Sequence, residues 1–267
     1  MIETFTEPHM PLEPLVIDQK FRRVAVLSDV HGNLPALNAC LADVERQDVE
    51  AVLFLGDFTW GPQPREVLSR VESLGMPSWF VMGNAERDVI EIAADTRAPD
   101  GQNDLWMVGA HGADGITTIS TYSPAIHIRV SGIGDIRLCH GSPRSDVELL
   151  TPETPPERIA RACVGVDDPI IGHGHTHVQY RRQVGERTVF GPGSVGLPYG
   201  TDGVPGARWA LLADGIDLRV TSYDIEDAIA AAHDVHYPGA DTVETMLRTP
   251  PTLAELVEDA ESKEFSD

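Results

Sequence analysis

The 267-residue sequence contains few cysteines and no long apolar run, and both absences exclude classes of protein. Only three cysteines occur, and they are Cys40, Cys139 and Cys163. They are widely spaced and form no Cys-x-x-Cys pair, so we expect neither a disulfide framework nor a cysteine-based zinc site, and a reducing compartment fits. No apolar stretch approaches the roughly 20 residues that span a bilayer, so we expect no membrane association. Residues 1–20 are acidic and contain prolines, unlike a signal peptide, so the cytoplasm is the expected location.

Basic residues are also scarce. The chain has 20 Lys and Arg against 42 Asp and Glu, which gives a formal net charge of −22. A chain this acidic repels polyanions, which argues against a partner that is long nucleic acid. A small phosphorylated substrate, including a nucleotide, stays compatible because bound cations reverse the field locally. The sequence does not indicate an oligomeric state.

The first half of the chain alternates between short apolar runs and helical patterns. Residues 24–27, 51–55 and 79–81 are apolar, as expected of strands that are buried on both faces. Apolar residues at helical spacing predict helices over 35–47 and 64–74. Strand, polar turn and helix in this order are typical of a largely parallel sheet, in which sites form beyond the carboxyl ends of the strands.

The second half has a β character. Strands are expected over 126–130, 136–139, 169–171, 178–184, 188–190, 208–212 and 216–220, with hairpins at Gly185-Glu186 and Asp214-Gly215. We expect an irregular N-terminal lead-in over 1–20, a domain over 21–225 and a C-terminal helical extension over 226–267. That extension either packs on the domain or forms an arm for a partner. Residues 95–120 are glycine-rich and are expected to form a loop or cap near the site.

Five short polar segments each follow a predicted strand. They supply two carboxylates, one amide oxygen and four imidazoles, from Asp29, His31, Asp57, Asn84, His140, His175 and His177. This mixed set of oxygen and nitrogen ligands suits Mn, Fe, Zn, Co or Ni and suits Ca poorly. We therefore expect two divalent transition-metal ions, with Mn favoured.

The charges of such a centre fit a phosphate substrate. Two divalent ions bring +4, and Asp29 and Asp57 remove two of these charges, which leaves the site positive. Two metal ions about 3.5–4 Å apart activate a bound hydroxide as nucleophile and stabilise an in-line displacement at phosphorus. One carboxylate must bridge the ions, and Asp57, alone at its strand end, is the natural candidate.

The ordered motifs Asp-x-His, Gly-Asp, Gly-Asn, His-Gly and Gly-His-Thr-His resemble the calcineurin-like metallophosphoesterases. The later segment Gly191 to Pro198 looks like the Asn-Pro-Gly-Ser segment of their small bacterial and archaeal phosphodiesterase (YfcE-like) branch. The resemblance covers roughly residues 22–223 and implies a four-layer αββα sandwich of two mixed β-sheets. It also implies that the two metal ions share Asp57 and divide the other ligands. The first ion would take Asp29, His31, Asp57 and His177, and the second Asp57, Asn84, His140 and His175.

One position departs from the family pattern. Many members have a His after Gly-Asn that assists the leaving group, whereas this chain has Ala85. A general acid typically contributes about 10²–10⁴-fold to the rate, so we expect a preference for good leaving groups or a proton donor elsewhere. We expect Asp57, Asn84 and His140 to be catalytic as well as metal-binding.

Several polar residues beside the ligands have two interpretations each. Arg87, Arg144 and Asn33 are candidates to bind substrate, although a surface arginine or, for Asn33, a helix cap explains them equally well. His173 is either an outer neighbour of the metal ligands or a buried core histidine. Ser194 is expected to shape the backbone near the site.

Three functions stay open at this point. The first is a metal-dependent phosphodiesterase or phosphatase that acts on a small molecule. The second is a non-catalytic metal-binding scaffold of the same fold, and the third is a protein phosphatase. The complete ligand set favours the first, because relic sites tend to lose ligands.

Overall fold

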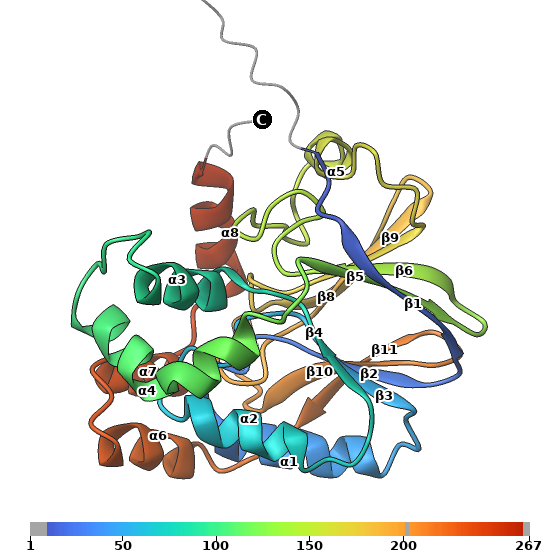
Figure 1. Ribbon diagram of the computed structural model, residues 1–267. Helices are drawn as coiled ribbons and strands as arrows, with labels where there is room; N and C mark the ends of the chain where they lie inside the picture. The colour runs from blue at the N-terminus through green and yellow to red at the C-terminus, as the bar shows by residue number, and fades with distance from the viewer. Residues whose placement is uncertain (1–9, 201–202, 264–267) are drawn as a thin grey trace, which may run out of the picture.

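The computed structural model describes residues 10–200 and 203–263, in which two β-sheets pack face to face (Figure 1). The five-stranded sheet has the order β11-β10-β2-β3-β4. Its strands are β2 (Val24–Leu27), β3 (Ala51–Phe54), β4 (Ser78–Phe80), β10 (Ala207–Leu212) and β11 (Ile216–Thr221). The six-stranded sheet has the order β1-β5-β6-β7-β9-β8. Its strands are β1 (Pro14–Phe21), β5 (Ala125–Val130), β6 (Gly134–Cys139), β7 (Ile170–His173), β8 (Gln179–Val184) and β9 (Arg187–Pro192).

Both sheets are mixed, as the family resemblance predicts. In the five-stranded sheet β2, β3 and β4 are parallel, while β10 runs antiparallel to β2 and β11. In the other sheet β6, β7 and β9 are parallel, and β5 and β8 run antiparallel to their neighbours β6 and β9. The βα alternation of the first half alone predicts a largely parallel sheet, which is correct for β2 to β4 only.

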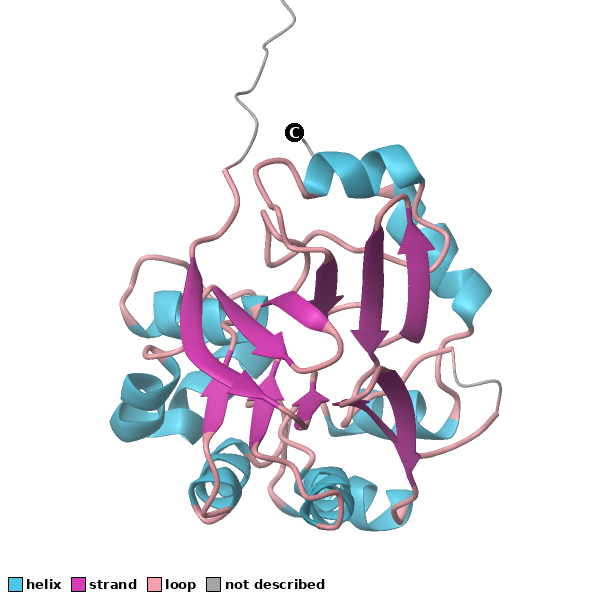
Figure 2. Ribbon diagram, turned by 90° about the vertical axis from the view of Figure 1, so that its right-hand side faces the viewer, coloured by secondary structure: helices cyan, strands magenta, loops and turns pink. Residues whose placement is uncertain are grey.

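Helices cover the outer faces of both sheets (Figure 2). The structure contains α1 (Leu34–Glu45), α2 (Pro64–Glu72), α3 (Asn84–Ala93), α4 (Gln102–Ile119), α5 (Pro156–Ala162), α6 (Ile225–Asp234), α7 (Ala240–Arg248) and α8 (Leu253–Ser262). Residues of α1, α2 and α6 share a core with the outer face of the five-stranded sheet. Residues of α5 and α8 pack on the outer face of the six-stranded sheet. A third cluster, which includes Val26, Leu53, Ile128 and Phe190, fills the space between the sheets. These layers form the αββα sandwich.

The expected irregular lead-in is wrong from Pro14 onward, because β1 pairs in parallel with β5 at the edge of the six-stranded sheet. An edge strand buries few side chains, and in β1 only Phe21 is fully buried. The apolar signal of the strand is therefore weak. Residues 1–9 of the predicted lead-in lie outside the described residues.

The expected loop over 95–120 is also wrong, because residues 102–119 form α4. Met107, His111, Gly115 and Ile119 recur every four residues and are buried on one face of this helix. Three glycines in the segment lower its helix propensity, and the helix is kinked at Gly112, where φ is 61°. Because of these glycines the sequence pattern did not predict the helix, which tertiary packing stabilises.

The C-terminal extension is helical, as predicted, and it packs on the rest of the chain. Ala232 and Ala240 join the core beneath the five-stranded sheet, and Leu253 packs against the other outer core. The extension comprises three helices, α6, α7 and α8. All three cysteines are free and buried. Among the described helices, none combines the length and apolar character that a membrane span requires.

Candidate metal centre

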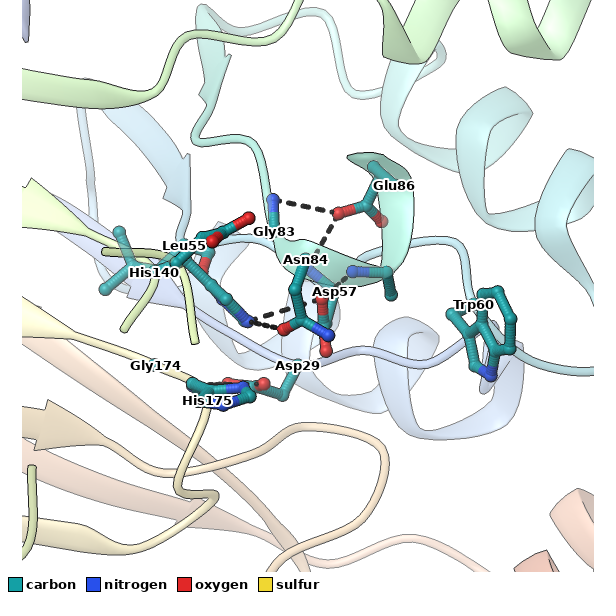
Figure 3. Close-up of polar contacts among 12 residues, drawn as sticks. Asp29, Leu55, Asp57, Trp60, Gly83, Asn84, Glu86, His140, Gly174 and His175 are labelled. Carbon is teal, nitrogen blue, oxygen red and sulfur yellow. Dashed lines mark hydrogen bonds and ion pairs between the residues drawn. The ribbon is translucent and has the colours of Figure 1, made fainter. Parts of the chain in front are cut away.

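The seven predicted ligands converge where strands of both sheets end. Figure 3 shows Asp29, Asp57, Asn84, His140 and His175 of this set. Asp29 and His31 follow β2, Asp57 follows β3 and Asn84 follows β4 in the five-stranded sheet. The remaining ligands follow β6 and β7 of the six-stranded sheet, and they are His140, His175 and His177. The site therefore lies at the junction of the two sheets, and each sheet supplies a different part of the ligand set.

The side chains form two compact groups of donor atoms. Asp29, His31 and His177 offer atoms that all lie within 4.8 Å of one another, and so do Asp57, His140 and His175. In the first group, His177 Nε2 lies 3.3 Å from Asp29 Oδ1. This division is the one that the resemblance implies.

Asn84 completes the second group, and Asp57 connects that group to the first. Asn84 Oδ1 lies 2.9 Å from His140 Nε2. Asp57 Oδ1 lies 3.3 Å from His140 Nε2, while Asp57 Oδ2 lies 3.8 Å from His31 Nε2. One carboxylate oxygen of Asp57 therefore faces each group, which is the arrangement that a bridging ligand requires.

Three of the imidazoles are oriented by backbone carbonyls. The Nδ1 atoms of His31, His140 and His177 lie 3.0, 2.6 and 2.7 Å from the carbonyl oxygens of Trp60, Leu55 and Leu197, respectively. An Nδ1–H that donates to a carbonyl leaves the Nε2 lone pair directed into the site, as is usual for metal-ligating histidines.

The contact between His31 and His177 tests whether this donor set fits a cation. Their Nε2 atoms lie only 3.0 Å apart. When both rings carry the proton on Nδ1, the two facing Nε2 atoms are both acceptors and repel each other. A shared cation removes this repulsion, so the residues present fit a divalent metal ion.

The backbone of the ligand loops is strained. Five of the seven ligands have a positive φ, with values of 53°, 50°, 48°, 64° and 59° for Asp29, His31, Asp57, His175 and His177, respectively. Non-glycine residues rarely adopt this left-handed conformation, and it concentrates at functional sites where the surroundings enforce it. The strain directs neighbouring side chains toward one point.

Glycines before two of the ligands allow this close approach. A Cβ at Gly83 would lie 2.3 Å from Asp57 Oδ1, and a Cβ at Gly174 would lie 2.7 Å from Asp29 Oδ2. Any side chain at these positions would therefore displace a carboxylate. The Gly-Asn and Gly-His pairs of the sequence have this physical cause.

The electrostatics of the centre stabilise positive charge. Burial alone would raise the pKa of Asp57, but the neighbouring His140 lowers it well below its usual range. Burial alone would lower the pKa of His140, whereas the Asp57 carboxylate raises it to about 10. Burial, with the charge of His140, lowers the pKa of His175 to about 4. The carboxylates are therefore ionised and the site attracts cations.

Glu86 holds the loop that carries Asp57 (Figure 3). Its Oε2 accepts the backbone N–H groups of Asp57 at 2.9 Å and Gly83 at 3.1 Å, and its Oε1 accepts those of Phe58 at 2.7 Å and Thr59 at 2.9 Å. The side chain is fully buried. Four backbone donors favour the ionised form, although burial and then the charge of Asp57 raise the pKa of Glu86. The prediction gave Glu86 no role.

A second missed contact joins this loop to α4. The hydroxyl of Thr59 lies 3.2 Å from Glu86 Oε1 and 2.8 Å from His111 Nε2. His111 Nδ1 lies 2.7 Å from the carbonyl oxygen of Met107. The sequence contains no pattern that pairs His111 with Thr59, because the two residues meet only after α4 packs beside the site.

The three candidate substrate residues are all engaged within the fold. Arg87 pairs with Asp146 at 2.6 Å, and Arg144 pairs with Glu148 at 2.9 Å. Asn33 caps α1 through its amide oxygen, as its alternative interpretation predicts, and donates from Nδ2 to the carbonyl oxygen of Gly196. Their roles toward substrate stay predictions.

Two neighbouring polar residues are accounted for by the fold. His173 is fully buried, and its Nε2 lies 2.7 Å from the hydroxyl of Tyr180, so it is a core histidine. The hydroxyl of Ser194 donates to the carbonyl oxygen of Asp29 and accepts from the N–H of Leu197. Ser194 therefore shapes the backbone beside the centre, as expected.

Comparison with known proteins places these motifs in a family. The model of the calcineurin-like phosphoesterase superfamily domain matches residues 23–210, which include all seven candidate ligands. An uncharacterised protein of Methanocaldococcus jannaschii, MJ0912, is 37% identical over 68 residues, and the match spans 25% of this chain and 27% of that protein.

Two solved structures share the fold over most of the chain. A metallophosphoesterase from Sphaerobacter thermophilus has a TM-score of 0.67 and 25% identity, with 85% of this chain and 99% of that chain covered. The hypothetical protein PH1004 from Pyrococcus horikoshii OT3 has a TM-score of 0.73 and 18% identity, with 86% of this chain and 98% of that chain covered.

Proposed function

The chain belongs to the calcineurin-like phosphoesterase superfamily, and from this premise we propose that it hydrolyses phosphoester bonds of small phosphorylated molecules, including nucleotides, at a centre of two divalent metal ions. Membership of the superfamily supports phosphoester hydrolysis in general. The observation that carries the proposal is the pair of donor groups that Asp57 connects, with one carboxylate oxygen facing each group.

In this proposal the two donor groups each hold one ion. Asp29, His31 and His177 would hold the first ion, Asn84, His140 and His175 would hold the second, and Asp57 would be a ligand to both. Two divalent ions at such a centre polarise the phosphoryl oxygens and activate water for in-line attack. Manganese is the metal that we would test first, followed by iron, zinc, cobalt and nickel.

The protein residues prepare this chemistry in two ways. Asp29 and Asp57 are ionised and remove two of the four positive charges, so that the loaded centre stays cationic toward a phosphate. The backbone carbonyls that hold His31, His140 and His177 fix the tautomers before substrate arrives, and fixed dipoles need no reorganisation during the reaction.

Ala85 limits the reactions that this centre performs well. Its side chain is a methyl group and its backbone N–H donates to Asp57 Oδ1 at 3.0 Å, so the residue positions the carboxylate but gives no proton. A leaving group that needs no protonation, such as an aryloxide, should therefore react best.

The test is hydrolysis of an aryl phosphodiester by the chain loaded with Mn²⁺. We expect turnover that chelation abolishes, and loss of most of it in Asp57→Asn and His140→Ala. Asp100→Asn is the matched control, because Asp100 is exposed and lies outside the ligand loops. A chain that binds metal without any turnover would favour the non-catalytic scaffold. Activity confined to phosphorylated proteins would favour a protein phosphatase.

A further inference from the structure

A cavity of about 270 Å³ lies between α7 and the start of α6. Its walls are mostly apolar and include Pro198, Pro205, Tyr223, Ile225, Met246 and Leu247. Cavities near 150 Å³ with apolar walls already bind benzene. This cavity therefore has room for an aromatic ring or a similar apolar group.

Two of the lining residues belong to segments that hold metal ligands. Pro198 lies between Leu197, whose carbonyl oxygen orients His177, and Tyr199, whose ring stacks on His177 with a centroid distance of 4.5 Å. On the other side, the hydroxyl of Tyr223 lies 3.4 Å from Nδ2 of Asn33. Asn33 ends the loop that carries His31, so two walls of the cavity are connected to the segments that position His177 and His31.

The charges around the cavity exclude a second anionic group. Arg248 is the one charged side chain among the described lining residues, and its guanidinium pairs with Glu226 at 2.6 Å and with Glu244 at 2.8 Å. Two carboxylates therefore neutralise this cation and leave the rim negative. An uncharged group suits the cavity, whereas another phosphate does not.

Part of the wall lies beyond the segment that matches the family model, although Pro198, Pro205 and Gly206 lie within it. The match to the superfamily ends at residue 210, whereas α6 begins at Ile225 and α7 at Ala240. Selectivity often comes from such additions, because loops and appended elements surround a site that the common fold positions.

We propose that this cavity receives the apolar or aromatic ester group of the phosphoester substrate, an inference that rests on the proposed hydrolytic function. The phosphate occupies the metal centre while its uncharged organic group lies against Tyr223 and Met246. Substrates of this chain are thus phosphoesters with one apolar or aromatic substituent, such as a nucleobase or an aryl ring.

The test measures binding of methylphosphonate, benzylphosphonate and 3-phenylpropylphosphonate to the Mn²⁺-loaded chain by calorimetry. Burial of one ring predicts that at least one of the two aryl phosphonates binds about tenfold or more tightly than methylphosphonate. This ratio of affinities is the preference for the ring. Met246→Trp fills the cavity and should lower this preference at least about fivefold. Leu247→Ala, which enlarges the cavity, should also lower it. Thr245→Trp adds the same ring to an exposed position of α7 and should leave the preference unchanged.

Hydrolysis of methyl p-nitrophenyl phosphate by the same preparations tests the proposed function separately. Turnover without any preference for the ring, or a preference that all three variants retain, overturns the assignment of the cavity alone. If Met246→Trp removes the preference for the ring, the assignment of the cavity is supported even when the chain shows no turnover. The lack of turnover would then overturn the proposed hydrolysis instead. A chain that neither binds the phosphonates nor turns over contradicts both.

Discussion

Replacement of Glu86 by glutamine tests whether the position of Asp57, the proposed bridging ligand, depends on Glu86. The Glu86 carboxylate accepts two backbone N–H groups on each oxygen. A glutamine amide keeps one oxygen and turns an NH₂ group toward the other two donors. Those two buried N–H groups then lack an acceptor, whichever way the amide is oriented.

The magnitude follows from these contacts. Each buried donor without an acceptor costs about 1–3 kcal/mol, so two cost about 2–6 kcal/mol. Removal of a buried charge offsets part of this loss, since burial raises the pKa of Glu86. We therefore expect the free energy of unfolding to fall by about 2–3 kcal/mol. Affinity for the second metal ion should fall about 10–100-fold, the usual effect of losing a group that orients a ligand.

The assay combines urea unfolding of the metal-free chain with Mn²⁺ titration against a chelating dye. Glu91→Gln makes the same exchange on the same helix, at a side chain that pairs with the half-buried Arg87 at 3.5 Å. It should change neither quantity appreciably. If Glu86→Gln unfolded and bound metal as Glu91→Gln does, the idea that Glu86 positions Asp57 would be refuted.

Three further predictions follow from particular contacts. Gly83→Ala places a Cβ 2.4 Å from the Asp57 backbone nitrogen and should abolish metal binding in the same titration, whereas Gly109→Ala, which meets no atom within 4 Å, should raise the unfolding free energy by about 0.5–1 kcal/mol. Burial lowers the pKa of His111 below its usual 6.5, so the unfolded chain binds a proton there that the folded chain does not. The metal-free chain should thus lose stability as pH falls from 6.5 to 5.5, and His111→Gln should reduce this loss by up to about 1 kcal/mol in urea unfolding at the two pH values; equal losses would contradict it. Because Ala85 donates no side-chain proton, an aryl phosphodiester should be hydrolysed at least about 10²-fold faster than an alkyl one, and equal rates would show that another group supplies the proton.

The sequence predicts the ligand loops well because each combines a short buried strand with a polar turn. Buried parallel strands appear as continuous apolar runs, and their carboxyl ends lie at one edge by topology. Asp29 and His140 could therefore be predicted to lie in one site, although 111 positions separate them in the sequence. The family resemblance supplied what spacing cannot, namely the two mixed sheets and the division of ligands.

Interactions between distant segments are the part that the sequence could not show. The role of Glu86 depends on four backbone N–H groups, which are present in every residue and leave no pattern. The strand β1 has a weak apolar signal because it pairs on one side only, and α4 contains glycines that its packing overrides. From the sequence, Arg87 and Arg144 were candidates to bind substrate, whereas the fold pairs them with Asp146 and Glu148.

The most direct test of the central claim is anomalous diffraction from crystals of the chain grown with Mn²⁺. We expect two manganese peaks, one within the group Asp29, His31 and His177 and the other within the group Asp57, His140 and His175. Crystals of the Asp57→Asn variant should lack at least one of these manganese peaks. Full occupancy of both peaks in Asp57→Asn, or the absence of manganese from these groups in the unmodified chain, would contradict a centre that Asp57 bridges.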